Sequence, residues 1–361
     1  MQLVTFELIA TQVASAPPAE DGAASRFTDD NLGFANLELL RPGMWRLGAI
    51  VPAGPDVDSI IDLNRALAVK LAGEDVGAPE AEADSLLPSN MLALLSAGPA
   101  AMAMAREAFD WAIRSLRAFD GPDLERGRVL IRRRRVRLHA PVPRPGKLVG
   151  VARNYAAHAA ERSADVPGEP VIFIKASSSV IGSAHDIVIP AASHAVDYEG
   201  ELAVVIGRAA RSVSRERALD HVAGYTIAND VTARDFQNAR GQRFFGKSGD
   251  TFCPMGPCLV TADEIDDPQK LRLETRVSGE TRQSAMTSEM IFPVAEVIAF
   301  ASQLMTLEPG DVILTGTPAG VGAASDPPRH LRDGDIVEIE IEGIGRLRNH
   351  VRAQTRSRAG H

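Results

Sequence analysis

The stretch Asp197-Tyr-Glu-Gly-Glu-Leu-Ala-Val-Val-Ile-Gly207 places two glutamates, Glu199 and Glu201, at the head of an apolar, β-branched run. The run predicts a strand, and on a strand residues i and i+2 project from the same face. Glu199 and Glu201 would therefore point into one space despite their mutual repulsion and the desolvation cost of burial. A hard divalent cation makes such a pair favourable, whereas an isolated pair of this kind is more often solvated on an exposed strand face.

The composition is that of an ordinary globular protein, with 361 residues of which 45% are hydrophobic and 24% charged. This length predicts two domains, or one large domain and a smaller one. The formal net charge of −8 argues against a nucleic-acid surface as the main function. The basic run Arg132–Arg135, with Arg137, is interpreted as a solvated strand or hinge face. No apolar run reaches the roughly 18 to 20 residues of a membrane span, and no signal peptide is evident at Met1, so we expect a cytoplasmic protein without a membrane partner.

The two cysteines, Cys253 and Cys258, have neither the usual CxxC spacing nor an accompanying histidine set. They are interpreted as reduced, partly buried thiols rather than metal ligands.

Residues 1–140 differ in character from the rest of the chain. Strands are predicted at 3–9 and 44–51, helices at 60–71 and 100–119, and a long loop at 12–32. No catalytic cluster occurs here, so we interpret this part as a small α/β N-terminal domain that packs against a catalytic domain or closes over its site.

Residues 141–146, Pro-Val-Pro-Arg-Pro-Gly, read as a linker to a second domain that ends near residue 352, followed by a polar tail at 353–361. Strands outnumber helices in this domain and do not alternate regularly with them, so it is predicted to be a β-rich α+β domain. The expected strands are 147–151, 171–174, 187–189, 202–206, 224–229, 258–261, 271–277, 312–315 and 336–341. The expected helices are 156–163, 215–221 and 293–305.

Asp230 ends an apolar run in Gly224-Tyr-Thr-Ile-Ala-Asn-Asp230. Together with Glu199 and Glu201 it supplies three oxygen ligands for Mg²⁺ or Mn²⁺, with Ca²⁺ as a further choice. An octahedral ion bound in this way keeps positions open for a chelating dioxo substrate and for water. Asp230 alone would more often be a turn or capping residue.

His158 and Glu161 are three residues apart in a predicted helix and share one of its faces. A carboxylate beside an imidazole orients it and raises its basicity, as is required to take a proton from water. By itself such a pair is more often a surface contact.

Lys175 and Lys247 lie next to apolar and small residues, where a lysine can contact a substrate carboxylate or stabilise an oxyanion. The alternative is a strand-end lysine whose ammonium group reaches water. The Gly-rich turn Leu314-Thr-Gly-Thr-Pro-Ala-Gly-Val-Gly322 can present backbone N–H groups and the Thr317 hydroxyl to an anion.

The sequence resembles the fumarylacetoacetate hydrolase family over roughly residues 141–345. Six blocks carry the resemblance in order, and they are Lys147–His158, Pro170–Lys175, Asp197–Gly207, Ala223–Asp235, Lys247–Pro257 and Leu314–Gly322.

The resemblance implies a mixed β-sheet roll, a homodimer and a divalent metal, with Glu199, Glu201 and Asp230 as ligands in the manner of a three-carboxylate, acylpyruvase-like branch. It places a water-activating pair at His158 and Glu161 on a short lid helix. It implies substrate contacts by Lys247, Gln237, Lys175, Thr317 and Gly316. Gly249 replaces a bulky aromatic residue that is frequent in the family, which changes the expected shape of the pocket.

The reaction that the resemblance implies first is hydrolysis of a C–C bond in a β-diketo acid of the acylpyruvate, fumarylpyruvate or fumarylacetoacetate type, with a place in aromatic catabolism. A metal-held enolate would be the leaving group, His158 would activate water and Lys247 would stabilise the oxyanion. The alternatives are decarboxylation of a 2-oxo acid such as oxaloacetate, and hydration or isomerisation of unsaturated 2-oxo acids. Decarboxylation and isomerisation need no activated water, so we expect loss of His158 to affect them less. An inactive binding protein on the same scaffold is the remaining alternative.

Overall fold

The computed structural model describes residues 1–9, 45–52, 59–118, 129–183, 185–240 and 243–354, with the side chains of 117–118 and 238–240 left out. The predicted loop at 12–32 and most of the polar tail lie outside these residues. The described strands are β1 (Gln2–Leu8), β2 (Arg46–Ile50), β3 (Ser59–Asp62), β4 (Leu130–Arg132), β5 (Val136–Leu138), β6 (Leu148–Ala152), β7 (Val171–Lys175), β8 (Val180–Ile181), β9 (Ile187–Ile189), β10 (Val196–Asp197), β11 (Gly200–Ile206), β12 (Val222–Asn229), β13 (Thr232–Ala233), β14 (Cys253–Thr261), β15 (Arg272–Val277), β16 (Glu280–Met286), β17 (Val312–Leu314), β18 (Ile336–Ile341) and β19 (Gly345–Ala353). The described α-helices are α2 (Leu63–Ala72), α3 (Pro79–Leu86), α4 (Met91–Ala97), α5 (Pro99–Ala118), α7 (Ala156–Glu161), α8 (Arg234–Arg240), α9 (Arg243–Lys247) and α10 (Val294–Leu304).

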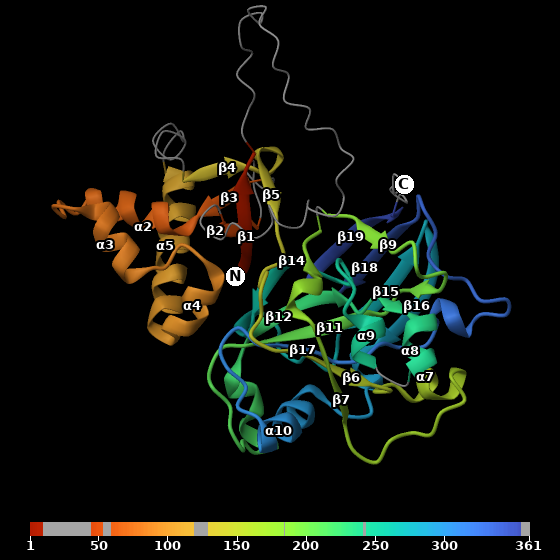
Figure 1. The fold of residues 1–361 in the computed structure, drawn as a ribbon. Coiled ribbons are helices and arrows are strands. Elements are labelled where there is room, and N and C mark those ends of the chain that lie inside the picture. The colour runs from red at the N-terminus through yellow and green to blue at the C-terminus, as the bar shows by residue number, and fades with distance from the viewer. Residues whose placement is uncertain (10–44, 53–58, 119–128, 184, 241–242, 355–361) are drawn as a thin grey trace, which may run out of the picture.

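Two sheets form the centre of the molecule (Figure 1). Within the described residues, the larger sheet follows the order β4-β3-β2-β1-β14-β12-β11-β17-β6-β7, and the smaller one the order β16-β15-β18-β19-β9. Both contain parallel and antiparallel pairs. Strands β15, β18 and β19 of the smaller sheet contact β11, β12 and β14 of the larger one. The predicted α+β class, a mixed β-sheet roll with a smaller N-terminal part, is confirmed.

The N-terminal segment is joined to the rest through the larger sheet. Strand β1 pairs antiparallel with β14, where Leu3 lies opposite Leu259. The ammonium group of Met1 donates a hydrogen bond to Thr261 Oγ1 at 2.8 Å. The sheet therefore runs continuously across the expected boundary at residue 140. The division into domains at 1–140, 141–352 and 353–361 stays a prediction.

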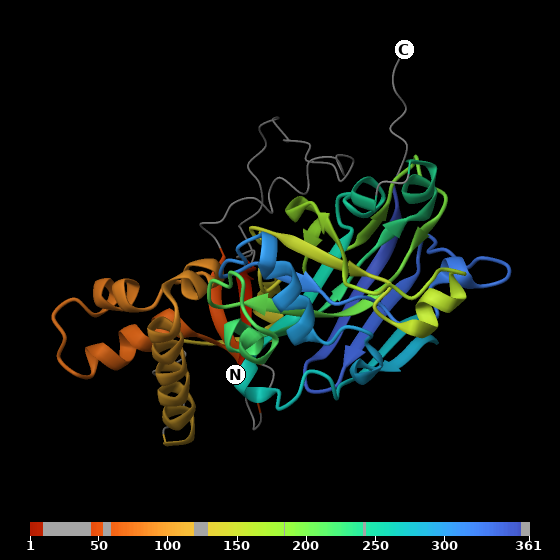
Figure 2. The same ribbon diagram turned by 90° about the horizontal axis from the view of Figure 1, so that it is seen from below.

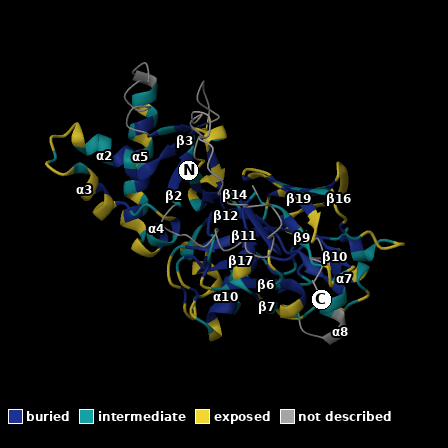
Figure 3. Ribbon diagram, turned by 45° about the horizontal axis from the view of Figure 1, so that its top comes forward, coloured by how far each residue is buried: buried dark blue, intermediate teal, exposed yellow. Residues whose placement is uncertain are grey.

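The core has two parts, one on each side of the larger sheet. Helices α2, α4 and α5 gather beside the N-terminal strands in both views (Figures 1 and 2) and bury apolar residues such as Leu67, Leu94 and Ala105. The second part lies between the two sheets and includes Leu202, Ile227 and Ile339. Figure 3 shows the larger sheet mostly buried, while β16 of the smaller sheet and the outward face of α3 are exposed. A site at the head of β11 is therefore supported by packed strands from both sheets.

One predicted helix is partly wrong. The segment 60–71 begins with a strand, since Ile60 and Ile61 are both buried between β2 and β4, and the helix starts only at Leu63. Asp62 caps it by accepting a hydrogen bond from the backbone N–H of Arg65.

The expected elements did not include α3, α4, α8, α9, β4, β5, β8, β10, β13, β16, β19 or the first half of β14. Strand β14 starts at Cys253, five residues earlier than predicted, because Cys253 and Pro254 pair with β8, and Met255 and Gly256 pair with β12 across a register shift. Strand β19 alternates buried and exposed residues, a pattern that was visible in the sequence. The segment 215–221 is a 3₁₀-helix. Both cysteines are free and buried, and Arg132, Arg134, Arg135 and Arg137 are exposed.

Candidate active site

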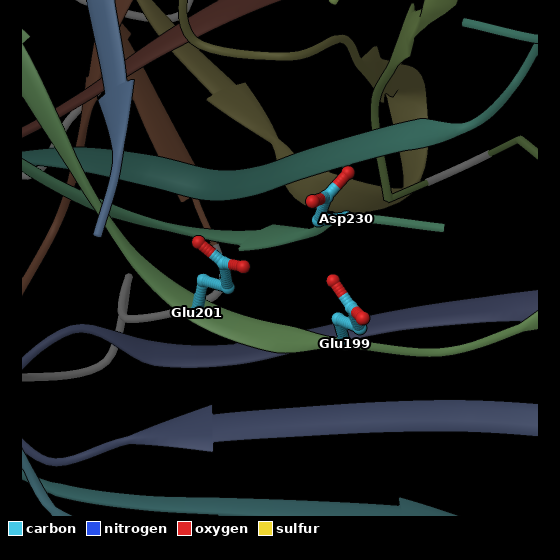
Figure 4. A group of neighbouring side chains, drawn as sticks. All are labelled: Glu199, Glu201 and Asp230. Carbon is cyan, nitrogen blue, oxygen red and sulfur yellow. The ribbon is translucent and has the colours of Figure 1, made fainter. Parts of the chain in front are cut away.

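Three carboxylates converge at the head of β11, as the sequence predicts (Figure 4). Glu199 directly precedes the strand, Glu201 lies within it, and Asp230 follows the neighbouring strand β12. Each offers an oxygen that lies within 4.8 Å of those of the other two, and all three residues are buried. The antiparallel pairing of Gly200 with Asn229 brings the two chain segments together. The predicted metal ligands thus form one cluster.

Cationic side chains surround Glu199 and Asp230. The Lys247 ammonium donates to Glu199 Oε2 at 2.7 Å and also contacts Asp230 Oδ2. Arg234 Nη2 lies 2.6 Å from Glu199 Oε1 and 2.8 Å from Asp197 Oδ2. Lys175 Nζ donates to Asp230 Oδ1 at 2.6 Å. These contacts fix the direction in which each carboxylate points.

Glu201 is held differently. Its Oε2 accepts a hydrogen bond from the backbone N–H of Gly316 at 2.6 Å, and no cationic side chain in the described part of the chain forms an ion pair with it. Burial and the nearby charges of Asp230 and Glu199 raise the pKa of Glu201 well above its ordinary value. This carboxylate therefore requires either a proton or a cation.

The pKa of Glu199 moves in the opposite direction. Burial raises it, but the positive charges of Lys247 and Arg234 oppose burial more strongly and bring the pKa of Glu199 below its ordinary value. Burial lowers the pKa of Lys247, yet Asp230 and Glu199 together keep it above its ordinary value. Glu199 is thus ionised and Lys247 charged at neutral pH.

This arrangement fits a hard divalent cation. Carboxylate oxygens are the preferred ligands of Mg²⁺, Mn²⁺ and Ca²⁺, and no histidine or cysteine joins the described cluster. Glu201, buried and without a cationic partner among the described residues, is where an added positive charge is required.

His158 and Glu161 form the predicted pair on α7. The His158 Nδ1 and Glu161 Oε1 atoms are 2.7 Å apart, and the other Glu161 oxygen accepts from the Gly320 N–H at 2.8 Å. A bond at Nδ1 fixes the tautomer of the ring, so Nε2 is left as the acceptor of a proton. His158 lines the same cavity as the three carboxylates.

The Gly-rich turn supports the carboxylates from the other side. Gly316 adopts φ +96°, and its N–H is used by Glu201 rather than being presented to an anion. The Thr317 hydroxyl donates to the Gly200 carbonyl at 3.0 Å and accepts from Gln283 Nε2 at 2.7 Å, while the residue still lines the cavity. The geometry therefore favours a supporting role for Gly316 over the predicted contact with substrate.

The cavity has a volume of about 450 Å³. Its described lining includes the three carboxylates, His158, Lys247, Thr317 and Gln237, so residues predicted from distant parts of the sequence meet in one space. Lys175 is not among them. Its ammonium group bonds to Asp230, the Val231 carbonyl and the Phe252 carbonyl, and its side chain is fully buried. The geometry thus argues against the predicted substrate contact by Lys175 and in favour of a role in positioning Asp230.

Several residues of the site were missed. Arg153, Arg162, Phe173, Arg234 and Arg243 also line the cavity. Arg234 lies within a block that carried the family resemblance, so its position was a usable signal. Gly249 is outside the described lining, and a Cβ at this position would contact the Phe252 ring at 3.2 Å.

Comparisons with known proteins extend these observations. The family model described as fumarylacetoacetate (FAA) hydrolase, C-terminal, matches residues 147–352. The chain is 44% identical over 271 residues to a Bacillus subtilis (strain 168) protein named oxaloacetate tautomerase YisK, which covers 73% of this chain and 87% of that protein.

Two solved structures are also similar to this chain. One from Mycobacterium marinum, described as a 2-hydroxyhepta-2,4-diene-1,7-dioate isomerase, is 44% identical with a TM-score of 0.56 and covers 63% of this chain and 82% of that one. A maleylpyruvate hydrolase from Sphingobium sp. SYK-6, solved with manganese(II) and pyruvate, is 31% identical with a TM-score of 0.63 and covers 86% of this chain and 97% of that one. The chain belongs to the fumarylacetoacetate hydrolase family.

Proposed function

We propose that this protein is a divalent-metal-dependent enzyme that interconverts the keto and enol forms of a 2-oxo acid of the oxaloacetate type. One observation carries the proposal, namely that an oriented base, His158, and a charged lysine, Lys247, line the same cavity as the carboxylate cluster. The similarity to an oxaloacetate tautomerase over most of its length supports this choice of reaction. It favours the alternatives from the sequence, which were decarboxylation of a 2-oxo acid such as oxaloacetate and hydration or isomerisation of unsaturated 2-oxo acids, over the hydrolysis that was placed first.

A divalent cation held by Glu199, Glu201 and Asp230 would supply Lewis acidity toward the 2-oxo oxygen of the substrate. His158 takes a proton from the carbon next to the 2-oxo group, and the electron pair of that C–H bond moves toward the oxygen. The proton is then returned to the oxygen, so no water is consumed. Glu161 holds the imidazole in the required tautomer and stabilises its protonated form.

Lys247 acts on the charge that develops during this transfer. Its ammonium group is buried beside Glu199 and Asp230 and lies 5.0 Å from the centre of the Phe173 ring. In a buried site, a fixed positive charge stabilises a nascent enolate oxygen far more than it would in water.

Hydrolysis of an acylpyruvate is the second candidate, because the maleylpyruvate hydrolase structure aligns over nearly its whole length. The same His158 would then deprotonate a water, and the C–C bond would break to release two acids. Since His158 serves both reactions, its replacement does not separate them, contrary to the expectation from sequence. The products do.

The test is to incubate the protein with Mg²⁺ or Mn²⁺ and either oxaloacetate or an acylpyruvate, and to follow keto, enol and pyruvate by NMR. We expect faster keto–enol exchange of oxaloacetate than with the metal ion alone, and no pyruvate. Pyruvate from oxaloacetate would indicate decarboxylation, and pyruvate from the acylpyruvate would indicate hydrolysis; either in place of exchange would overturn the proposal. A protein without any of these activities would favour the inactive binding protein.

A further inference from the structure

Gln283 is a buried polar side chain on a strand that is otherwise open to solvent. Among the residues of β16, all of which the structure describes, it alone is buried, with an exposed fraction of 1%. Strand β16 is the outermost strand in the described order of the smaller sheet. A buried amide is costly unless protein groups replace the water that it loses. The partners of Gln283 therefore indicate what this residue does.

Gln283 binds the backbone at the point where the two glutamates of the cluster are joined. Its Oε1 accepts a hydrogen bond from the N–H of Gly200, the residue between them, at 3.0 Å. Its Nε2 donates to Thr317 Oγ1 at 2.7 Å and to the Pro318 carbonyl at 2.9 Å. The Thr317 hydroxyl in turn donates to the Gly200 carbonyl at 3.0 Å. The N–H and the C=O of Gly200 are thus both held through one side chain.

The two peptide units that connect the glutamates, one on either side of Gly200, are fixed by these contacts. The first unit donates its N–H to Gln283, and its carbonyl accepts from the Asp230 N–H at 2.8 Å. The carbonyl of the second unit accepts from the Thr317 hydroxyl. On a strand, the planes of two successive peptide units determine how the side chains at i and i+2 share a face. Figure 4 shows both glutamates pointing to the side on which Asp230 lies.

The smaller sheet approaches β11 closely at the same point. A Cβ on Gly200 would lie 2.2 Å from Thr275 Oγ1 and 3.3 Å from Gln283 Oε1. Thr275 is the residue opposite Gln283 in the pairing of β15 with β16. A side chain at position 200 would therefore displace Thr275, and the amide of Gln283 reaches the ligand-bearing strand because glycine leaves room for it.

The Gly-rich turn is held by the same amide. Gly316 donates its N–H to Glu201, and the next two residues of the turn are the ones that bind Gln283. Gln283 thus acts on Glu201 from two directions, through the backbone of β11 and through the turn. Groups that hold metal ligands in place typically change metal affinity about 10- to 100-fold when they are removed.

We infer that Gln283 is a positioning residue for the metal centre. From the smaller sheet, it sets the separation and direction of Glu199 and Glu201 through the peptide units around Gly200. This inference rests on the proposed function only in taking a divalent cation as bound, and not on the reaction. A residue that only connected the two sheets would affect stability but not affinity for the cation.

Binding of Mn²⁺ to the full chain, followed by electron paramagnetic resonance of the free ion, tests this role without turnover. Gln283→Met keeps the length of the side chain and removes its three hydrogen bonds. We expect the dissociation constant for Mn²⁺ to rise about 10- to 100-fold in this variant.

Asn349→Leu is the matched control. Asn349 is also buried on the smaller sheet, but its amide donates to the carbonyls of Gly182 and His185, and it lies outside the cavity lining. This variant should also lower the melting temperature, while its dissociation constant for Mn²⁺ stays within about twofold of the native value, as for distant and independent sites.

Thr317 supplies a second test that does not require Gln283→Met to fold. Thr317→Val removes the hydroxyl at nearly constant volume, whereas Thr317→Ser keeps it. We expect the Val variant to bind Mn²⁺ about tenfold more weakly, and the Ser variant to retain the native affinity. The double variant Gln283→Met/Thr317→Val should be little weaker than the weaker single variant, because both side chains act through Gly200.

An unchanged Mn²⁺ affinity in Gln283→Met would overturn the inference. The same holds for an equal loss of affinity in Asn349→Leu, for native affinity in Thr317→Val, and for a native protein that binds no Mn²⁺. If the expected losses are found but keto–enol exchange of oxaloacetate is absent, the positioning role stands and the proposed function fails. Exchange that requires Mn²⁺, with an affinity that does not respond to Gln283→Met, has the opposite meaning.

Discussion

Glu161 links the base of the site to the Gly-rich turn, since one of its oxygens lies 2.7 Å from His158 Nδ1 and the other accepts from the Gly320 N–H at 2.8 Å. Orientation of the imidazole is therefore coupled to the position of the turn that also holds Glu201 through Gly316. A small change at Glu161 should act on catalysis rather than on binding.

Glu161→Gln should lower kcat about 10- to 100-fold with a small effect on KM, because the ring loses the charge that stabilises its protonated form. Steady-state kinetics in Mg²⁺ measure kcat and KM separately and so test this expectation. Glu169→Gln, at an exposed glutamate, is the control. An unchanged kcat in Glu161→Gln would remove this pair from the mechanism.

Glu201→Gln should abolish the rise in melting temperature that Mn²⁺ gives the native protein, and should leave the metal-free melting temperature unchanged or higher. The reason is that Glu201 is a buried carboxylate without a cationic partner among the described residues. A neutral amide at this position avoids the free-energy cost of burying an unpaired negative charge, but it is a poorer ligand for the metal ion. Thermal melts with and without Mn²⁺ provide the measurement. Full activity of this variant in added Mg²⁺ would take the metal out of the proposal.

Lys247→Met should destabilise the metal-free protein by about 3 kcal/mol, because it removes one of the two cationic partners of each of two buried carboxylates, leaving Glu199 with Arg234 and Asp230 with Lys175. Mn²⁺ should restore part of this loss but not the activity. Lys270→Met, at a lysine whose side chain is 77% exposed, should cost less than about 1 kcal/mol. Denaturant unfolding compares the two variants, and equal effects would contradict the predicted role of Lys247.

Gly316→Ala should destabilise the protein by about 2 to 4 kcal/mol and weaken metal binding. Its φ of +96° disfavours a side chain, and a Cβ there would lie 2.7 Å from Asn154 Cβ. Gly334→Ala isolates the backbone contribution, since φ is +86° but nothing lies within 4 Å of the added carbon. We expect about 1 kcal/mol for this control. Similar losses in both variants would show that the contact with Asn154 does not matter.

His185 should make the fold sensitive to acid. Burial lowers its pKa to about 4 from an ordinary 6.5, with a smaller contribution from His139, whose ring centre is 5.4 Å away. The unfolded chain then binds more protons than the folded one between these values, so stability is complete above pH 6.5 and is lost as the pH falls toward 4.

His185→Phe should therefore flatten the loss of stability between pH 6.5 and 4 by on the order of 2 kcal/mol. Unfolding curves across this range test it, with His350→Phe as the exposed control. A pH profile identical to that of the native protein would contradict the assignment.

Much of the site was predictable because its residues follow local rules. The spacing of Glu199 and Glu201 and the three-residue separation of His158 and Glu161 each specify a shared face of one element. The place of Asp230 could not be predicted from such spacing, because only the pairing of β11 with β12 brings it close to the two glutamates. The resemblance to the family supported the grouping of Asp230 with Glu199 and Glu201, which spacing along the chain does not show.

Other features depend on contacts between distant segments and were missed or assigned differently. From the sequence, Lys175 is expected at the end of a strand, in contact with water or with substrate. In the structure its ammonium group is enclosed by three acceptors, on Asp230, Val231 and Phe252, which lie 55 to 77 residues further along the chain. Likewise, Ile60 and Ile61 suit a helix by spacing, but two neighbouring strands make them part of a sheet.

The amino-acid sequence alone determined the class of the fold, the oxygen-rich character of the metal ligands and the presence of an oriented base, because each follows from residue types at short spacings. Only the tertiary structure decided which charges compensate which carboxylates, that Glu201 is the one without a cationic partner in the described chain, and that four arginines meet in one cavity. The physical reason is that electrostatic energies depend on separation and burial in space, and neither is encoded by distance along the chain.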